Sequence, residues 1–135
     1  MSKASYKGYK GEVEFAELLT DVFKIWNYEF VRRGGQERFK KIHAGDVVLD
    51  PRTDKNEKCF LRNYFLEAKK HATPDLWAVM REAEKNAREH YKHGAIAYIR
   101  KSGEKRSDNG ELIVMTPQTF KKIVVELQGF ITNGE

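Results

Sequence analysis

Hydrophobic residues recur at helical spacing in three segments of the chain, which predicts three amphipathic helices. The first covers residues 11–26, the second begins at the Thr-Pro-Asp sequence of 73–75 and runs to about Tyr91, and the third begins at Thr116 and Pro117. The residues at 73–75 suit the cap and first turn of a helix. The apolar stripes comprise Phe15, Leu18, Leu19, Val22, Phe23 and Trp26 in the first helix, Leu76, Val79, Met80, Ala83 and Ala87 in the second, and Phe120, Ile123, Val124 and Leu127 in the third.

Between these helices, short runs of β-branched, aromatic and aliphatic residues predict strands. The strands are expected at residues 28–32, 46–50, 59–69, 95–100 and 111–115. The resulting order, α-β-β-β-α-β-β-α, argues for an α/β fold with a mixed central sheet flanked by helices. No repeat or Pro/Gly/Ser-rich linker divides the chain. We therefore expect one domain over residues 1–135, with a flexible basic tail at 1–9 and a C-terminal tail at 129–135.

Composition narrows the classes of protein. A length of 135 residues excludes a TIM barrel and a dinucleotide-binding enzyme with a separate substrate domain. The net charge of +5 and the pI of about 9.3 favour a polyanionic partner. The single cysteine, Cys59, excludes an internal disulfide and a cysteine-based zinc site, and it fits a reducing cytoplasm. No apolar run approaches the length of a membrane span, so no membrane partner is expected.

Two short strings carry the candidate chemistry. Gly45-Asp46-Val47-Val48 opens one predicted strand, and Leu66-Glu67-Ala68-Lys69 closes the next. Because strand side chains alternate between faces, Glu67 and Lys69 point the same way. In an antiparallel hairpin, Asp46 faces Glu67 if the turn is centred between Asn56 and Glu57, whereas a slip of one residue would separate the two carboxylates. The sequence leaves this register open.

If the two carboxylates meet, their repulsion calls for a cation between them. Carboxylate and backbone carbonyl oxygens suit Mg²⁺, for which Mn²⁺ can substitute. Such a cation can polarise a phosphate and activate water, and Lys69 can position that water or stabilise the transition state. Glu12 shares the inward helix face with Phe15, Ala16 and Leu19, whereas Glu14 is expected to be more exposed to solvent.

The GDVV and LEAKK strings resemble the two-part motif of the PD-(D/E)XK nuclease superfamily. The chain is most similar to archaeal-type Holliday junction resolvases and their phage-encoded relatives, which open with a Lys-Gly segment and a Glu-bearing helix, followed by a Gly-rich basic loop. Here these features are Lys10-Gly11 with Glu12 (or Lys7-Gly8) and the RGGQ sequence at 33–36. The similarity covers roughly residues 7–100.

The resemblance implies a restriction-endonuclease-like fold and a Mg²⁺-dependent DNA endonuclease that nicks four-way junctions. It assigns Asp46, Glu67 and the Ala68 carbonyl as metal ligands, Lys69 as the catalytic lysine, and Glu12 as an additional acid that contacts the metal directly or through water. Three features depart from the family. Gly45 replaces a proline, Glu82 lies near the place of an expected glutamine, and Gln36 lies near that of an expected loop serine.

A DNA-contacting surface is expected beside this site, in the basic loop and its neighbours. Its candidates are Lys7, Lys10, Arg32, Arg33, Gly34, Gly35, Gln36, Arg38, Lys40, Lys41, Lys70 and His71. Paired cuts in a junction imply a two-fold homodimer, whose interface is expected at residues 111–115 or on the last helix with Phe130 and Ile131. The enzyme would act in the cytoplasm, which is that of the host if the gene is carried by a phage.

Other interpretations stay open. The same fold could act on other branched, damaged or duplex DNA, or the chain could be a nucleic-acid-binding module without catalysis. Glu67 and Lys69 could form a simple surface ion pair, and Glu12 could serve only the dipole of a first helical turn. The basic loops could be solvated faces, and Trp26 and Trp77 are expected to pack rather than to stack on bases.

Overall fold

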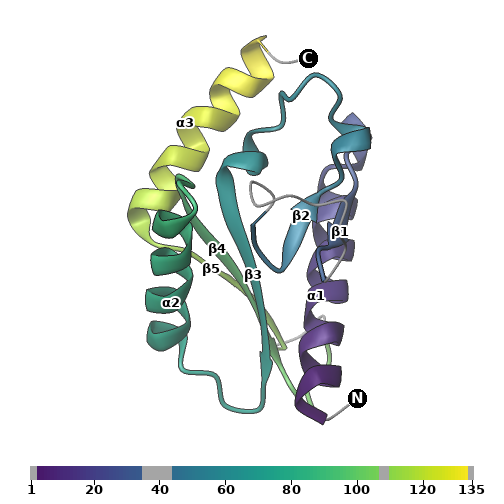
Figure 1. The fold of residues 1–135 in the computed structure, drawn as a ribbon, viewed down its shortest axis with the longest axis vertical. Helices are drawn as coiled ribbons and strands as arrows, with labels where there is room; N and C mark the ends of the chain where they lie inside the picture. The colour runs from purple at the N-terminus through teal and green to yellow at the C-terminus, as the bar shows by residue number, and fades with distance from the viewer. Residues whose placement is uncertain (1–2, 35–43, 107–109, 134–135) are drawn as a thin grey trace.

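The computed structural model describes residues 3–34, 44–106 and 110–133, with side chains from Lys10 onward. Three helices and five strands lie in these ranges (Figure 1). The helices are α1 (Lys3–Val22), α2 (Leu76–Glu89) and α3 (Pro117–Asn133). The strands are β1 (Phe30–Arg32), β2 (Val47–Leu49), β3 (Tyr64–His71), β4 (Gly94–Lys101) and β5 (Glu111–Val114). The prediction of a single α/β domain with a mixed sheet is confirmed.

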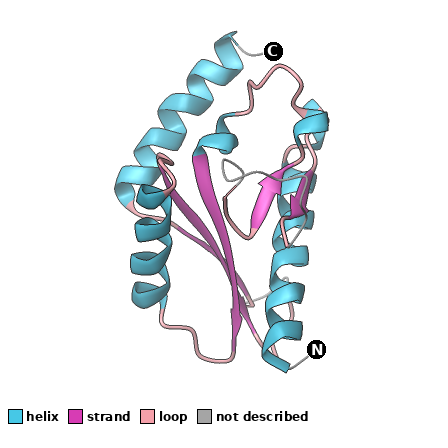
Figure 2. Cartoon of the chain, viewed as in Figure 1, coloured by secondary structure: helices cyan, strands magenta, loops and turns pink. Residues whose placement is uncertain are grey.

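The five strands form one sheet in the order β1-β2-β3-β4-β5. Only β3 and β4 are parallel, and α2 makes the crossover between them, as parallel neighbours require. The other three pairs are antiparallel. Because β1 and β2 are short, β3 extends well beyond them toward the turn that leads to α2 (Figure 2).

Helices cover both faces of the sheet. α1 and α3 share one hydrophobic cluster, in which Phe15 stacks on Tyr98 with ring centroids 5.2 Å apart and Phe130 closes the far end. α2 packs on the opposite face, where Ala83 and Met80 meet the small residues Ala95 and Ala97 of β4. Alternate residues of β4 therefore serve two separate cores, which explains why residues 94–99 of the strand form a continuous apolar run.

The ends of two helices differ from the prediction. α1 begins at Lys3 rather than at residue 11, so residues 3–9 are helical, and a short 3-10 helix over Lys24–Trp26 follows it. The apolar stripe marks only the part of α1 that the core covers. α3 continues through residues 129–133, because Phe130 keeps the helical spacing of Ile123 and Leu127 and is buried with them. Neither predicted tail is correct for these residues.

Burial of Phe130 also corrects the expected dimer surface. The ring is only 6% exposed and packs against Trp26 and Phe60 at centroid distances of 5.2 and 6.0 Å. It is therefore part of the core and cannot contact a second subunit. The packing of Trp26 agrees with the prediction.

The strand predicted at 59–69 is also displaced. Residues Phe60–Asn63 form a 3-10 helix, and β3 begins only at Tyr64. The buried carboxylate of Asp54 explains the difference, since it accepts the backbone N–H groups of Lys58 and Cys59 and so draws this segment into a turn. Cys59 is buried in the core as expected.

Gly45 lies close to the backbone of β3. Its φ of +123° lies in a region that side chains disfavour, and a Cβ atom there would lie 3.0 Å from the carbonyl oxygen of Leu66 and 3.2 Å from its nitrogen. Gly103 has a φ of +86° but nothing within 4 Å of its Cβ position. A side chain at position 103 would therefore cause backbone strain alone, whereas one at position 45 would cause strain and also meet the backbone of β3.

We predict that Gly45→Ala destabilises the protein more than Gly103→Ala does. The second change costs only the strained backbone, about 1 kcal/mol, whereas the first adds a clash with β3 and costs about 3 kcal/mol. Urea unfolding of both variants measures the difference. Equal losses would show that β3 does not lie against Gly45.

Candidate active site

The pairing of β2 with β3 decides whether the two acids meet. Val47 pairs with Leu66, which is the register that sets Asp46 opposite Glu67. The backbone N–H of Asp46 donates to the Leu66 carbonyl at 2.9 Å, and the Asp46 Oδ2 accepts the N–H of Ala68 at 3.0 Å. The Asp46 carboxylate, one residue before β2 begins, thus takes the place of a backbone acceptor for the Ala68 N–H.

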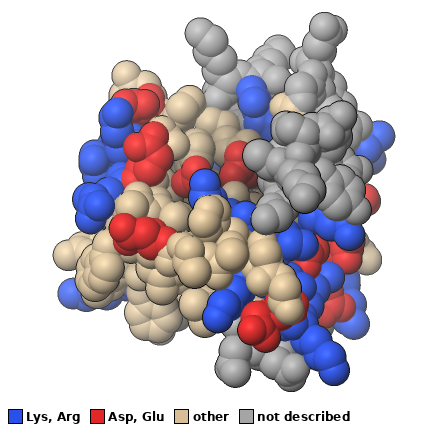
Figure 3. Space-filling model, turned by 90° about the horizontal axis from the view of Figure 1, so that it is seen from below, with Lys and Arg blue, Asp and Glu red and all other residues tan. Residues whose placement is uncertain are grey.

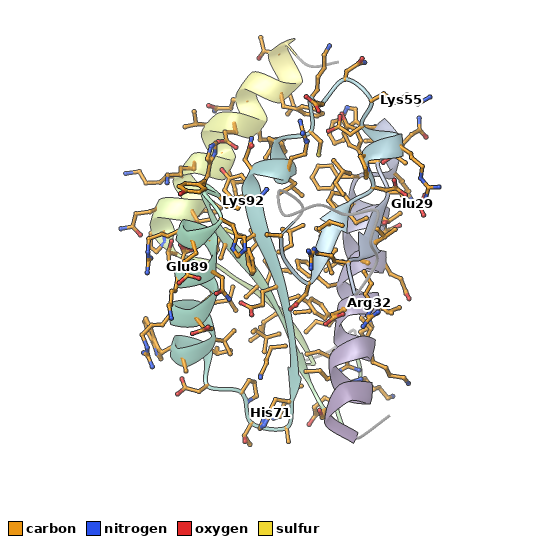
Figure 4. The ribbon with its side chains drawn as sticks, in the orientation of Figure 1. Glu29, Arg32, Lys55, His71, Glu89 and Lys92 are labelled. Atoms are coloured by element: carbon orange, nitrogen blue, oxygen red, sulfur yellow. The ribbon has the colours of Figure 1, made fainter. Side chains whose placement is uncertain are left out.

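Every second side chain at the end of β3 points toward α2. These side chains are Glu67, Lys69 and His71. They line a groove of about 380 Å³ between the end of β3 and the first half of α2. The other lining residues are Thr73, Pro74, Asp75, Ala78, Val79 and Glu82. Figure 4 shows His71 at this end of β3 and Lys92 at the opposite end. The groove therefore holds an acid, a lysine and a histidine in one row.

One carboxylate oxygen of Glu67, Oε2, is buried in this groove without a hydrogen bond from the described residues. The pKa of Glu67 is raised to about 7, chiefly by burial and then by the negative charges of Asp46 and Glu82, which the positive charge of Lys69 offsets only in part. Such a carboxylate is poised to take a proton or a cation.

The pKa values of Asp46 and Glu12 are raised as well. Burial raises the pKa of Asp46, against the N–H of Ala68 and the charges of Lys69 and Arg32. Burial and the charge of Asp46 raise the pKa of Glu12, although the Arg32 Nε lies 2.7 Å from its Oε1. Glu12 stands in the middle of α1, so the interpretation as a first-turn dipole residue is wrong.

Glu14 is not solvent-exposed, contrary to the prediction. Its side chain is only 14% exposed and accepts hydrogen bonds from the Arg100 Nε at 2.8 Å and the Lys70 Nζ at 3.3 Å. Burial raises the pKa of Glu14, but these two bonds outweigh it and hold the pKa below its ordinary value. The signal in the sequence is the glycine at position 11, three residues before Glu14 on the same helix face, because glycine lets α1 approach Lys70 closely, with 3.2 Å between the ideal Cβ position of Gly11 and the Lys70 Cβ.

The remaining candidates divide into three groups. Lys70 is bound to Glu14 and 15% exposed, which is at odds with its expected contact to DNA. Arg33 and Gly34 directly follow β1, and the Arg33 N–H donates to the Asp46 carbonyl at 3.0 Å. Lys10 is exposed on α1. Gly35, Gln36, Arg38, Lys40, Lys41 and the side chain of Lys7 lie outside the described residues.

The surface around the site is mixed in charge. In the view from below, basic and acidic side chains are interleaved, and acidic ones lie near the middle as well as at the margins (Figure 3). Trp77 is 80% exposed in the first turn of α2, so the expectation that it packs is wrong. A single stripe of smaller residues, which includes Leu76 and Met80, already covers the sheet and leaves Trp77 outside.

The donor set fits a small divalent cation. Among the residues whose side chains are described, no three His, Cys, Asp or Glu side chains converge as metal ligands. The expected set requires only two, Asp46 and Glu67, together with the carbonyl of Ala68. A strand residue directs its N–H and C=O to the same side, so this carbonyl faces the side on which Asp46 accepts the Ala68 N–H. The buried, unpartnered Glu67 oxygen supplies the observation that favours a cation here.

Comparison with protein-family models, curated proteins and solved structures finds no match to this chain. None of the helices in the described ranges is long and apolar enough to cross a membrane. The geometry of the site itself must therefore carry the functional argument.

We predict that the Glu67 carboxyl of the metal-free protein titrates near pH 7, with ¹³C NMR of the side chain as the measurement. Since the pKa of Glu67 in the folded state lies above the ordinary 4.5, its protonation favours folding below pH 4.5, and this contribution is lost as the pH rises through about 7. Asp46→Asn removes one cause of the raised pKa and should lower the midpoint. A midpoint near 4.5 in the wild type would contradict the assigned burial and proximity.

Proposed function

We propose that this protein is a divalent-metal-dependent endonuclease that hydrolyses phosphodiester bonds in DNA, with the four-way junction as its substrate. One observation carries the proposal. The β2–β3 register sets Asp46 opposite Glu67, whose buried Oε2 has no partner among the described residues, and Lys69 follows on the same face of β3. The resemblance of the GDVV and LEAKK strings to the PD-(D/E)XK motif supports the same conclusion.

Each residue of the site has a distinct task in this reaction. Asp46, Glu67 and the Ala68 carbonyl would hold Mg²⁺ or Mn²⁺. The bound cation supplies charge neutralisation on the phosphate and a lowered pKa of water. Lys69 reaches the same groove and donates to the phosphate oxygens, on which negative charge increases in the transition state. Burial of Asp46 and Glu67 strengthens these electrostatic interactions relative to those in water.

Glu12 and Arg32 support the site from the side of α1. Their ion pair joins α1 to β1 next to Asp46, and both residues change the pKa of Asp46 or respond to its charge. Arg32 is labelled in Figure 4 beside α1. The pair balances one negative charge beside the two metal-binding acids, so Glu12 acts near the cation without being required as a direct ligand.

Symmetric cleavage of a junction needs two active sites, and we propose a two-fold homodimer. Two surfaces could form the interface. The edge strand β5 exposes Leu112 and Ile113 by 49% and 46%, and α3 exposes Phe120 and Ile131 by 57% and 50%. Both lie within the segments that the sequence suggested, without Phe130.

A cleavage assay tests the function. A labelled four-way junction and a matching duplex are incubated with the protein, with and without Mg²⁺ or Mn²⁺. We expect symmetric, metal-dependent nicks in the junction only. Glu67→Gln should reduce the rate by at least about 100-fold because it removes a charged ligand. Glu89→Gln on the exposed part of α2 is the matched control and should keep full activity.

The other outcomes are equally informative. Cleavage of both substrates would retain the active site and reject junction specificity. Binding of DNA without any cleavage in either metal would reject the nuclease and favour a nucleic-acid-binding module. Equal activity of wild type and Glu67→Gln would reject the assigned site.

A further inference from the structure

His71 ends the row of groove residues on β3. It follows Glu67 and Lys69 at alternate positions, which are spaced by about 6.6 Å along a strand. That interval is comparable to the distance between neighbouring phosphates of one DNA strand. The groove that contains Glu67 and Lys69 also contains His71, so all three side chains face the same space.

The hydrogen bonding of His71 defines which ring nitrogen can donate. The backbone N–H of Thr73 donates to Nδ1 of His71 at 3.1 Å. Nδ1 must therefore carry the lone pair, and in the neutral ring the hydrogen lies on Nε2. The neutral His71 ring thus presents one N–H donor, which lies on the edge opposite the bond from Thr73.

Charge decides which part of the groove suits an anion. Glu67 and Glu82 repel each other and line the groove together, whereas Lys69 and His71 supply its donors. Asp75 also lines the groove, but its Oδ1 is engaged as the cap of α2, where it accepts the Ala78 N–H at 3.1 Å. Without a bound cation, the end of the groove at His71 therefore suits a phosphodiester better than the end at Glu67 and Glu82 does.

We propose that the Nε2–H of His71 binds the phosphodiester next to the scissile one, on the same DNA strand. This inference rests on the proposed function, since it takes the scissile phosphate to lie at Glu67 and Lys69. His71 acts as an uncharged donor, which fixes the direction of the strand along the groove. It binds substrate and takes no part in the chemical step.

Binding to a labelled junction in metal-free buffer tests the proposal, with fluorescence anisotropy as the readout. His71→Ala should weaken binding about tenfold, because one hydrogen bond to a charged acceptor is lost. His71→Gln, which restores an N–H donor, should recover most of this loss. His90→Ala, at the other end of α2, is the matched control and should bind as the wild type does.

The dependence of affinity on salt distinguishes a neutral donor from a cation. A contact made by a neutral donor releases no counterion, so the slope of log affinity against log salt should be unchanged in His71→Ala. Lys69→Ala should reduce the steepness of that slope by about 1. A similar reduction in His71→Ala would overturn the neutral-donor assignment, and unchanged affinity would overturn the contact itself. Thermal unfolding confirms that each variant is folded.

The two proposals fail in different ways. A wild type that cleaves DNA while His71→Ala binds normally rejects only the role of His71. A wild type that binds with the expected His71 effects but never cleaves rejects the nuclease and retains the phosphate contact. Absence of DNA binding rejects both.

Discussion

The antiparallel register between β2 and β3 is the constraint on which the site depends. Val47 faces the core shared with α1, and its pairing with Leu66 leaves Asp46, one residue before β2 begins, to accept the Ala68 N–H. A slip of one residue would bury Asp46 in that core and turn Val47 outward. The hydrophobic effect therefore holds two like charges together, and burial together with the repulsion from Asp46 raises the pKa of Glu67.

A second constraint fixes α1 over β3. Glu14 binds Lys70 of β3 and Arg100 of β4, while Arg106 donates to the Glu14 carbonyl at 2.7 Å. Since Lys70 adjoins Lys69 in sequence and points to the other face, this buried ion network orients the strand from behind the groove. Removing one partner of such a network leaves a buried charge uncompensated, which is far costlier than breaking a surface pair. β3 therefore carries both Lys70 of the ion network and the proposed active-site residues Glu67 and Lys69.

Much of this arrangement could be predicted from local patterns, and the parts that could not depend on distant residues. Periodicity located the helices and strands, and alternation placed Glu67 with Lys69. The register could not be derived because Asp54 folds the connection between β2 and β3 into turns. Glu14 was misjudged because its partners Arg100 and Arg106 lie far along the chain. The exposure of Trp77 could not be predicted, because helical spacing alone does not show how much of the circumference of α2 the sheet covers.

Paramagnetic NMR with Mn²⁺ tests the central claim that Asp46 and Glu67 form one cation site. We predict that substoichiometric Mn²⁺ selectively broadens the backbone amide signals of residues 45–47 and 66–69, and that Asp46→Asn abolishes this effect. The measurement needs neither DNA nor activity. Broadening centred elsewhere in the chain, or broadening of the same signals that persists in Asp46→Asn, would contradict the account.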